Sequence, residues 1–138
     1  MADVTIQFDE GAVEALVAGP DVAAMMDMLA GRVLSAMKAD CPVSPYGSGE
    51  NPSGFLRSSC RAAREPDGSM IIGPTAPYGL WVQNGTPPHI IRAHGDYSLH
   101  NAHTGQYFGP VVHHPGTAAQ PFITDSLAAI AGAIEEVG

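Results

Sequence analysis

The chain has 138 residues, of which 45% are hydrophobic and 14% charged, and its formal net charge is −8. The length predicts a single domain, residues 1–138, with one hydrophobic core. Six Lys and Arg residues against 14 Asp and Glu residues argue against tight nucleic-acid binding, although an acidic protein can pass close to DNA without adhering. The low charged fraction fits either a surface that partners cover or simply an Ala- and Gly-rich composition.

The first residues lack the basic and apolar regions of a secretory signal, and no apolar run is long enough to span a membrane. We therefore expect no membrane partner. Cys41 and Cys60 stand 19 residues apart without a C-x-x-C neighbour, so they form no zinc-binding pattern. A reduced pair in a cytoplasmic protein and a single disulfide in an exported protein both remain open.

The N-terminal third is predicted to be mainly helical. Alternating apolar residues in Val4–Phe8 predict a short strand, and Gly11–Gly19 predicts one or two turns of helix. Asp21 is suited to cap a longer helix, which ends before Pro42. The apolar positions of this longer helix recur at helical spacing: Val22, Met25 or Met26, Leu29, Val33 and Met37.

The next segment combines a loop with a hairpin. Pro, Ser, Gly and Asn crowd Pro42–Gly54, which is typical of a loop, and Phe55–Ala63 fits a short helix or the start of a strand. Pro66-Asp67-Gly68 predicts a tight turn, so Arg61–Glu65 and Ser69–Gly73 are expected to pair as a β-hairpin. The helical spacing of Arg57, Arg61 and Arg64 predicts a basic stripe. This stripe would be either a solvated face or a surface for an acidic partner.

The middle of the chain is its most informative part. An apolar and aromatic run, Ala76–Thr86, contains an Asn-Gly turn, and its Trp81 is predicted to anchor the core. His89–Ala93 and Tyr107–Val112 are predicted strands. The polar connection between them, residues 94–106, is long enough to indicate a function, and we expect a protruding hairpin tip or a docking loop.

A helix is predicted at the C-terminal end. Pro121 suits its first position, and its apolar stripe comprises Ile123, Leu127, Ile130, Ile134 and Val137. Together these elements predict an α+β fold. In this fold a small antiparallel sheet packs against a long helix from the N-terminal half and a C-terminal helix, and a long β-hairpin or loop forms an arm.

The residues offer little for catalysis. All six histidines lie between His89 and His114. Neighbouring residues on a strand point to opposite faces, so His113 and His114 could not both bind one metal without an irregular backbone. No metal-binding motif surrounds them, Cys60 has no evident base, and no phosphate-binding glycine loop is present. We therefore expect no enzymatic activity, no catalytic residue, no bound metal and no cofactor. A metal-dependent hydrolase that uses His89, His113 and His114 stays as a rival hypothesis.

Three motifs follow one another along the chain. They are Ser53-Gly54-Phe55-Leu56-Arg57-Ser58-Ser59, then Ala76-Pro77-Tyr78-Gly79-Leu80-Trp81-Val82-Gln83-Asn84-Gly85-Thr86, and finally His114-Pro115-Gly116-Thr117-Ala118-Ala119-Gln120-Pro121-Phe122-Ile123. Their order resembles that of the tail-completion (neck, or minor tail) proteins of long-tailed double-stranded DNA bacteriophages, a family also filed as head–tail joining proteins. The resemblance covers most of the chain, from about Val22 to Leu127.

This resemblance implies a structural virion protein: a small α+β subunit of a ring, six-fold to match the tail, that joins head and tail and lines the DNA passage. Its partners would be further copies of itself, the adjoining head-side stopper or connector, and the tail terminator or tail-tube proteins. DNA would pass through the lumen without specific binding. The protein would be located in the neck or tail of the virion, and in the host cytoplasm during assembly. A tail terminator or a head-completion stopper of the same neck is the alternative.

The resemblance also implies roles for residues. Contacts with other subunits or neighbouring rings are expected in the arm and the terminal helix, above all at Ile90, Ile91, Arg92, Tyr97 and Tyr107. Structural roles in the core or in turns are expected for Gly54, Leu56, Tyr78, Trp81, Gly85, Thr86, His114, Pro115, Gly116, Pro121 and Phe122. The chain departs from the family pattern at Gln83 and Asn84, where members usually carry an acidic and an aromatic residue, and in its His-rich 94–106 connection.

Overall fold

The computed structural model describes residues 5–7, 9–47 and 49–135, and it has the α+β composition that the sequence predicts. α1 (Glu10–Val17) begins after Asp9, whose Oδ1 accepts hydrogen bonds from the first free N–H groups of the helix. α2 (Pro20–Asp40) is the long helix expected in this half. The prediction that Asp21 caps α2 is wrong. Gly19 precedes the helix and Pro20 is its first residue. The N–H of a first helical residue has no acceptor within the helix, so the missing N–H of proline costs no hydrogen bond there.

α3 (Phe55–Ser59) runs directly into β1 (Cys60–Arg64), so the segment that fitted either a helix or a strand contains both. β1 pairs with β2 (Met70–Pro74) in the antiparallel register Arg64↔Met70, which confirms the predicted hairpin. The turn between them is closed by Asp67, whose carboxylate accepts hydrogen bonds from the N–H and the hydroxyl of Ser69.

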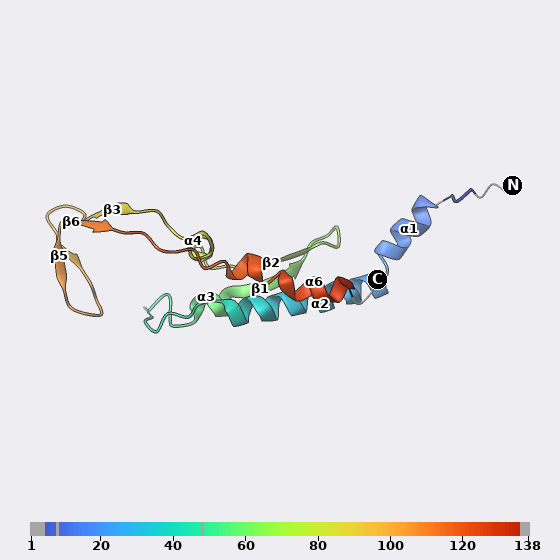
Figure 1. Cartoon of the computed structure of the whole chain (residues 1–138), viewed down its shortest axis with the longest axis horizontal. Helices are drawn as coiled ribbons and strands as arrows, with labels where there is room; N and C mark the ends of the chain where they lie inside the picture. The colour runs from blue at the N-terminus through green and yellow to red at the C-terminus, as the bar shows by residue number, and fades with distance from the viewer. Residues whose placement is uncertain (1–4, 8, 48, 136–138) are drawn as a thin grey trace.

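The hydrophobic core lies where α2 packs against this hairpin and the C-terminal helices. α5 (Phe122–Asp125) and α6 (Ala128–Glu135) lie along α2 (Figure 1). The buried cluster that joins these elements comprises Val33, Met37, Cys41, Leu56, Cys60, Ala76 and Phe122. Within the described ranges, none of the helices is long and apolar enough to cross a membrane.

Two predictions near the ends of the chain need correction. Residues 5–7 form neither strand nor helix, and Ile6 is exposed without a strand beside it, while Val4 and Phe8 lie outside the described residues. The C-terminal helix is not continuous, because a turn at Ser126–Leu127 separates α5 from α6. Ile123 and Ile130 pack against the core as predicted, but the same turn leaves Leu127 exposed. Val137 and the side chain of Ile134 lie outside the described part.

The antiparallel strands form three separate pairs in the described residues, where a single small sheet had been expected. α4 (Gly79–Asn84) leads into β3 (His89–Arg92), which pairs with β6 (Val111–His114) in the register His89↔His114. Between these strands, β4 (Leu99–His100) and β5 (Tyr107–Gly109) form a second, shorter hairpin. The long polar connection is therefore a hairpin nested within a hairpin. We call residues 87–114 the arm and the remaining described residues the body.

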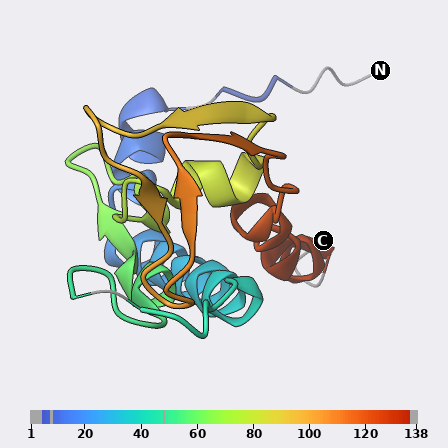
Figure 2. The same ribbon diagram turned by 90° about the vertical axis from the view of Figure 1, so that its left-hand side faces the viewer.

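The molecule is elongated, and the arm projects from one end of it. α1 and the turn between β1 and β2 lie toward the other end (Figure 1). Both views show the β4–β5 hairpin turning away from the β3–β6 pair (Figures 1 and 2). Its tip returns to the loop after α2, where the rings of His103 and Tyr46 are 4.8 Å apart.

Candidate assembly surface

A clamp between the second and third sequence motifs holds the arm at its base. Thr86 and Thr117 exchange two backbone hydrogen bonds of 3.0 Å, and their hydroxyl oxygens are also 3.0 Å apart. Next to them, the backbone N–H of Gln120 donates to the carbonyl of Val82 at 2.9 Å. The ends of the arm, separated by about thirty residues of chain, are thereby fixed side by side on the body.

Two glycines allow this close approach. Gly85 and Gly116 have φ angles of 71° and 85°, a conformation that L side chains rarely adopt. A Cβ at Gly85 would lie 2.5 Å from the carbonyl oxygen of Thr117, and a Cβ at Gly116 would overlap the carbonyl oxygen of Thr86. Both positions therefore favour glycine. Gly85 follows α4 as its C-cap, and the N–H of Gly116 donates to the Nδ1 of His114 at 3.1 Å.

Gln83 joins α4 to α5. Its side-chain oxygen accepts the backbone N–H of Ile123 at 2.8 Å, and its amide nitrogen donates to the hydroxyl of Thr124 at 2.9 Å. The side chain is buried, with the residue 8% exposed. At the position where the phage proteins that the sequence resembles usually carry an acidic residue, this chain therefore uses a neutral amide for a contact within the chain.

The remaining motif residues lie in the core and at helix ends. Leu56 and Phe122 are buried core residues, and Tyr78 packs partly buried against them at the start of α4. Gly54, with a φ of 77°, precedes α3. Pro121 precedes α5 as its cap, one residue earlier than the first helical position that was predicted.

The prediction that Trp81 anchors the core is wrong, because its side chain is 66% exposed. α4 is only six residues long, and it buries the face that contains Gly79 and Gln83. Gly79 fits against Pro74 and Leu56 where a larger residue would collide with the proline ring. Leu80 and Trp81 consequently face solvent beside the clamp, as an apolar patch on the body.

The five residues expected at interfaces are all exposed on the arm. Tyr97 and Tyr107 are 78% and 70% exposed, and the ring of Tyr107 lies against His100 with 4.6 Å between centroids. In the β3–β6 pair, Ile90 and Arg92 share one face, while Ile91 lies on the opposite face. Each face of this two-stranded ribbon thus presents an aliphatic side chain to solvent.

The histidines lie along the arm and do not converge. His89 and His114 are register partners whose rings stack at 4.9 Å, and the Nδ1 of His89 is 2.9 Å from the carbonyl of Pro87. His113 pairs with Ile90 on the other face of the ribbon. Among the residues that the structure describes, no group of three or more His, Cys, Asp or Glu side chains could hold a metal ion. The rival hydrolase hypothesis therefore has no metal centre in this part of the chain.

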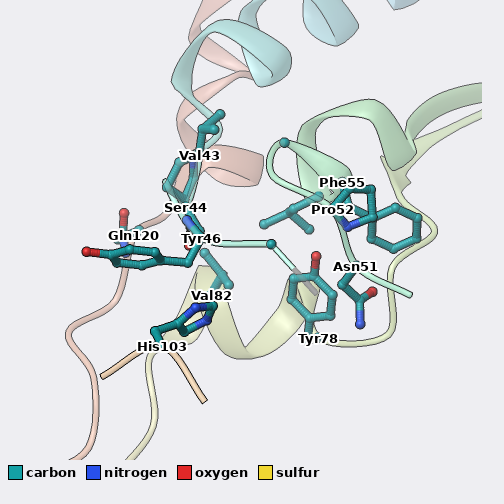
Figure 3. A pocket seen from close by; sticks show the side chains of 14 residues that line it. Val43, Ser44, Tyr46, Asn51, Pro52, Phe55, Tyr78, Val82, His103 and Gln120 are labelled. Carbon is teal, nitrogen blue, oxygen red and sulfur yellow. Dashed lines mark hydrogen bonds between the residues drawn. The ribbon is translucent and has the colours of Figure 1, made fainter. Parts of the chain in front are cut away.

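A cavity of about 740 Å³ lies between the loop after α2, α4 and the tip of the arm (Figure 3). Phe55, Tyr78 and Val82 line it on the body side, and Tyr46 and His103 close it on the arm side. Its walls are mixed: apolar and aromatic residues predominate, and Ser44, Asn51 and Gln120 contribute polar side chains. The titratable side chains of this lining are those of Tyr46, Tyr78 and His103, and among the described residues it contains no carboxylate and no thiol.

The two thiols are buried beside one another and free. Burial, reinforced by the neighbouring Cys60, raises the pKa of Cys41 from 9.0 to about 11. Burial also raises the pKa of Cys60. Both sulfurs are therefore protonated at neutral pH, and a protonated thiol is a poor nucleophile.

The predicted basic stripe does not form, because Arg57 lies in α3 while Arg61 and Arg64 lie in β1. Arg57 donates to the carbonyl of Cys41 at 3.2 Å, where α2 ends. Arg64 forms an ion pair of 2.6 Å with Asp27 on α2. Two of the three side chains thus fasten body elements together.

Three residues of the clamp region lie outside the set chosen from the sequence: Gln83, Thr117 and Ser126. Ser126 is fully buried and bonds the carbonyl of Ile123 at the break between α5 and α6. The one sequence signal for a structural role of Ser126 is that this polar residue lies next to the apolar stripe predicted for the C-terminal helix. Comparison of the chain with protein-family models, curated proteins and solved structures yields no match.

Proposed function

We propose that this chain is a ring-forming structural subunit of a long-tailed bacteriophage neck, of the tail-completion or head–tail connector class, and that it catalyses no reaction. The observation that supports this most is the arrangement of two of the three family-like motifs. They meet in the Thr86–Thr117 clamp and hold a projecting arm whose exposed side chains include Ile90 and Tyr97. An arm that is fixed at its base and exposes aliphatic and aromatic side chains is suited to contact neighbouring subunits.

The extent of exposed surface supports an assembled state. The chain exposes 10348 Å², whereas a compact monomer of 14.3 kDa exposes about 6,800 Å². The exposed residues include large apolar side chains on the arm, on α4 and on α1, such as Tyr97, Trp81 and Leu16. Apolar surface of this extent is typical of a protein whose partners cover it.

The acidic charge supports a position beside DNA. Six copies with a net charge of −8 each carry −48 together. A lumen with this sign of charge would repel the phosphate backbone and let DNA slide through without adhering. Mapping charge on the assembled ring tests this part separately, since a basic lumen contradicts it.

The proposal is tested by purifying the chain and measuring its mass in solution and on phage particles. Native mass spectrometry and electron microscopy should show a closed ring, at high concentration or upon addition of purified tails. Purified tails or heads should capture the ring, and capture by tails alone or by heads alone would separate the tail-side class from the stopper alternative. A chain that stays monomeric and that neither particle captures contradicts the proposal, as does its absence from purified virions.

A further inference from the structure

A groove in the body lies toward the end opposite the arm. It runs between the α1–α2 junction and the turn that joins β1 to β2, and its volume is about 440 Å³. In Figure 1 these two segments lie on the right, whereas the arm projects to the left. Because the arm and the groove are separated along the long axis, an arm can reach this groove only on another copy of the chain.

The groove has an apolar side and an acidic side. Val17, Val22 and Met26 line it from α1 and α2, and Glu65 and Asp67 line it from the turn between β1 and β2. The two hydrogen bonds from Ser69 lower the pKa of Asp67 and keep its carboxylate charged. The basic residue of the groove, Arg64, is already paired with Asp27 at 2.6 Å, so the side lined by Glu65 and Asp67 presents negative charge.

The arm has the complementary chemistry. Its single Arg or Lys residue is Arg92, its single acidic residue is Asp96, and all six histidines of the chain belong to it. With neutral histidines the arm carries no net charge, so the −8 of the chain belongs to the rest of the sequence. The exposed Ile90 shares a face with Arg92, which places an apolar and a cationic group side by side.

The ribbon itself would be stabilised by a partner. β3 and β6 are four residues each, and an isolated two-stranded ribbon is marginally stable in water. Within the described part of the chain, β3 pairs with β6 and with no third strand. Seating one face in an apolar groove would supply the cover that the ribbon lacks.

From this complementarity we propose that the arm of one copy docks into the groove of the next, with Ile90 against the apolar side and Arg92 facing Glu65 and Asp67. The contact joins different surfaces of two copies, and repeating such a head-to-tail contact closes a ring when the rotation between copies allows it. The inference rests on the proposed ring and specifies the surfaces that form it.

Photo-crosslinking tests which surfaces meet. The photoreactive residue p-benzoylphenylalanine replaces Tyr97 in the full-length chain, and mixed ¹⁵N-labelled and unlabelled copies identify peptides joined between chains. Crosslinks from position 97 to residues 17–26 or 65–69 of another copy support the proposal. Crosslinks between copies that reach only other surfaces overturn it.

Charge reversal provides an independent test. Arg92→Glu and Glu65→Arg should each weaken assembly by about tenfold, because each places like charges together, and the double variant should recover most of the loss. Arg32→Glu reverses an exposed charge on α2, away from the arm and the groove, and should leave assembly unchanged. Sedimentation velocity across a concentration series gives the association constants.

The outcomes separate this contact from the ring itself. A ring that forms equally well with Arg92→Glu, Glu65→Arg and the wild-type chain overturns the arm-to-groove contact and leaves the proposed function standing. A chain that remains monomeric alone and on purified tails and heads overturns both. Loss of assembly in both single variants without recovery in the double variant also overturns the proposed pairing of these charges.

Discussion

The side-chain oxygen of Gln83 accepts the backbone N–H of Ile123 at 2.8 Å. This N–H belongs to the first turn of α5, where the helix itself provides no acceptor. Because Gln83 also ends the buried face of α4, one side chain links the C-terminal helices to the base of the arm. The position of the arm on the body therefore depends on a polar contact within the subunit.

Replacing Gln83 with Leu should destabilise the monomer by about 1–3 kcal/mol, because it leaves the N–H of Ile123 without its partner in a part-buried site. The free energy of unfolding in urea measures the loss. Asn84→Leu, at the exposed neighbouring position, is the matched control and should change stability by less than about 0.5 kcal/mol. Equal effects of the two variants would show that the hydrogen bonds of Gln83 contribute nothing to the free energy of unfolding.

Gly116→Ala should destabilise the chain by about 2–4 kcal/mol, since the new Cβ meets the carbonyl oxygen of Thr86 in addition to the strain of a positive φ. Gly109→Ala separates these two causes. Gly109 has a similar φ of 80° but no atom within 4 Å of the added Cβ, so it should cost only about 1 kcal/mol. Urea unfolding measures both, and a Gly109→Ala effect as large as that of Gly116→Ala would contradict the tight clamp.

Phe122→Ala should cost about 3–5 kcal/mol, because the ring is 2% exposed and its removal leaves a cavity in the core. Trp81→Ala removes a larger side chain, yet the monomer should lose less than about 0.5 kcal/mol, since that side chain already faces water. Thermal or urea unfolding of the isolated monomer measures both values. A large loss for Trp81→Ala would mean that the tryptophan is covered within the subunit.

The contrast between Phe122 and Trp81 shows what the sequence could and could not reveal. Both residues were expected to have structural roles in the core, and for Phe122 the prediction is correct. The exposure of Trp81 is set by its position around the helix axis. Gly79 and Gln83 lie four residues apart on the buried face of α4, and Trp81 lies on a different face. The size of an apolar side chain alone does not reveal that Gly79 faces inward to fit against Pro74.

Local sequence signals predicted the helices and strands better than they predicted which of them pair or pack together. The spacing of apolar residues located α2, and the Pro-Asp-Gly turn located the β1–β2 hairpin. The strand at the start of the arm was expected, but the single strand expected at Tyr107–Val112 is divided at Pro110 into β5 and β6. The register of β3 with β6 joins residues far apart in the chain, and no local pattern encodes it. The contact of Gln83 with α5 is also long-range, and a polar residue in an apolar run gives no indication of which distant N–H it will meet.

The buried thiols predict a pH dependence of stability. The fold raises the pKa of Cys41 from 9.0 to about 11, so the folded chain holds this proton more tightly than the unfolded chain does. The contribution is therefore fully present below pH 9 and is lost as the pH rises from about 9 to about 11. The difference in unfolding free energy between the wild-type chain and Cys41→Ala, measured from pH 8 to pH 11, should shrink across that window. A difference that stays constant would show that Cys41 titrates alike in both states.

Shortening the arm should separate folding from assembly. Arg92 and Val111 are register partners, so an Asn-Gly turn in place of residues 93–110 can close β3 and β6 into a two-residue hairpin. The buried core lies outside the removed residues, so the free energy of unfolding should change by no more than about 1 kcal/mol. Assembly should weaken by at least about tenfold, because Tyr97 and Tyr107 are removed.

Urea unfolding and sedimentation velocity measure the two properties on the same preparation of the shortened chain. The double variant Tyr97→Ser/Tyr107→Ser is the control for the new turn, since it keeps the arm at full length and removes the same aromatic surface. If shortening abolished cooperative unfolding, the arm would belong to the core of the subunit. If assembly were unchanged in both variants, the exposed aromatic residues of the arm would lie outside the contact between copies.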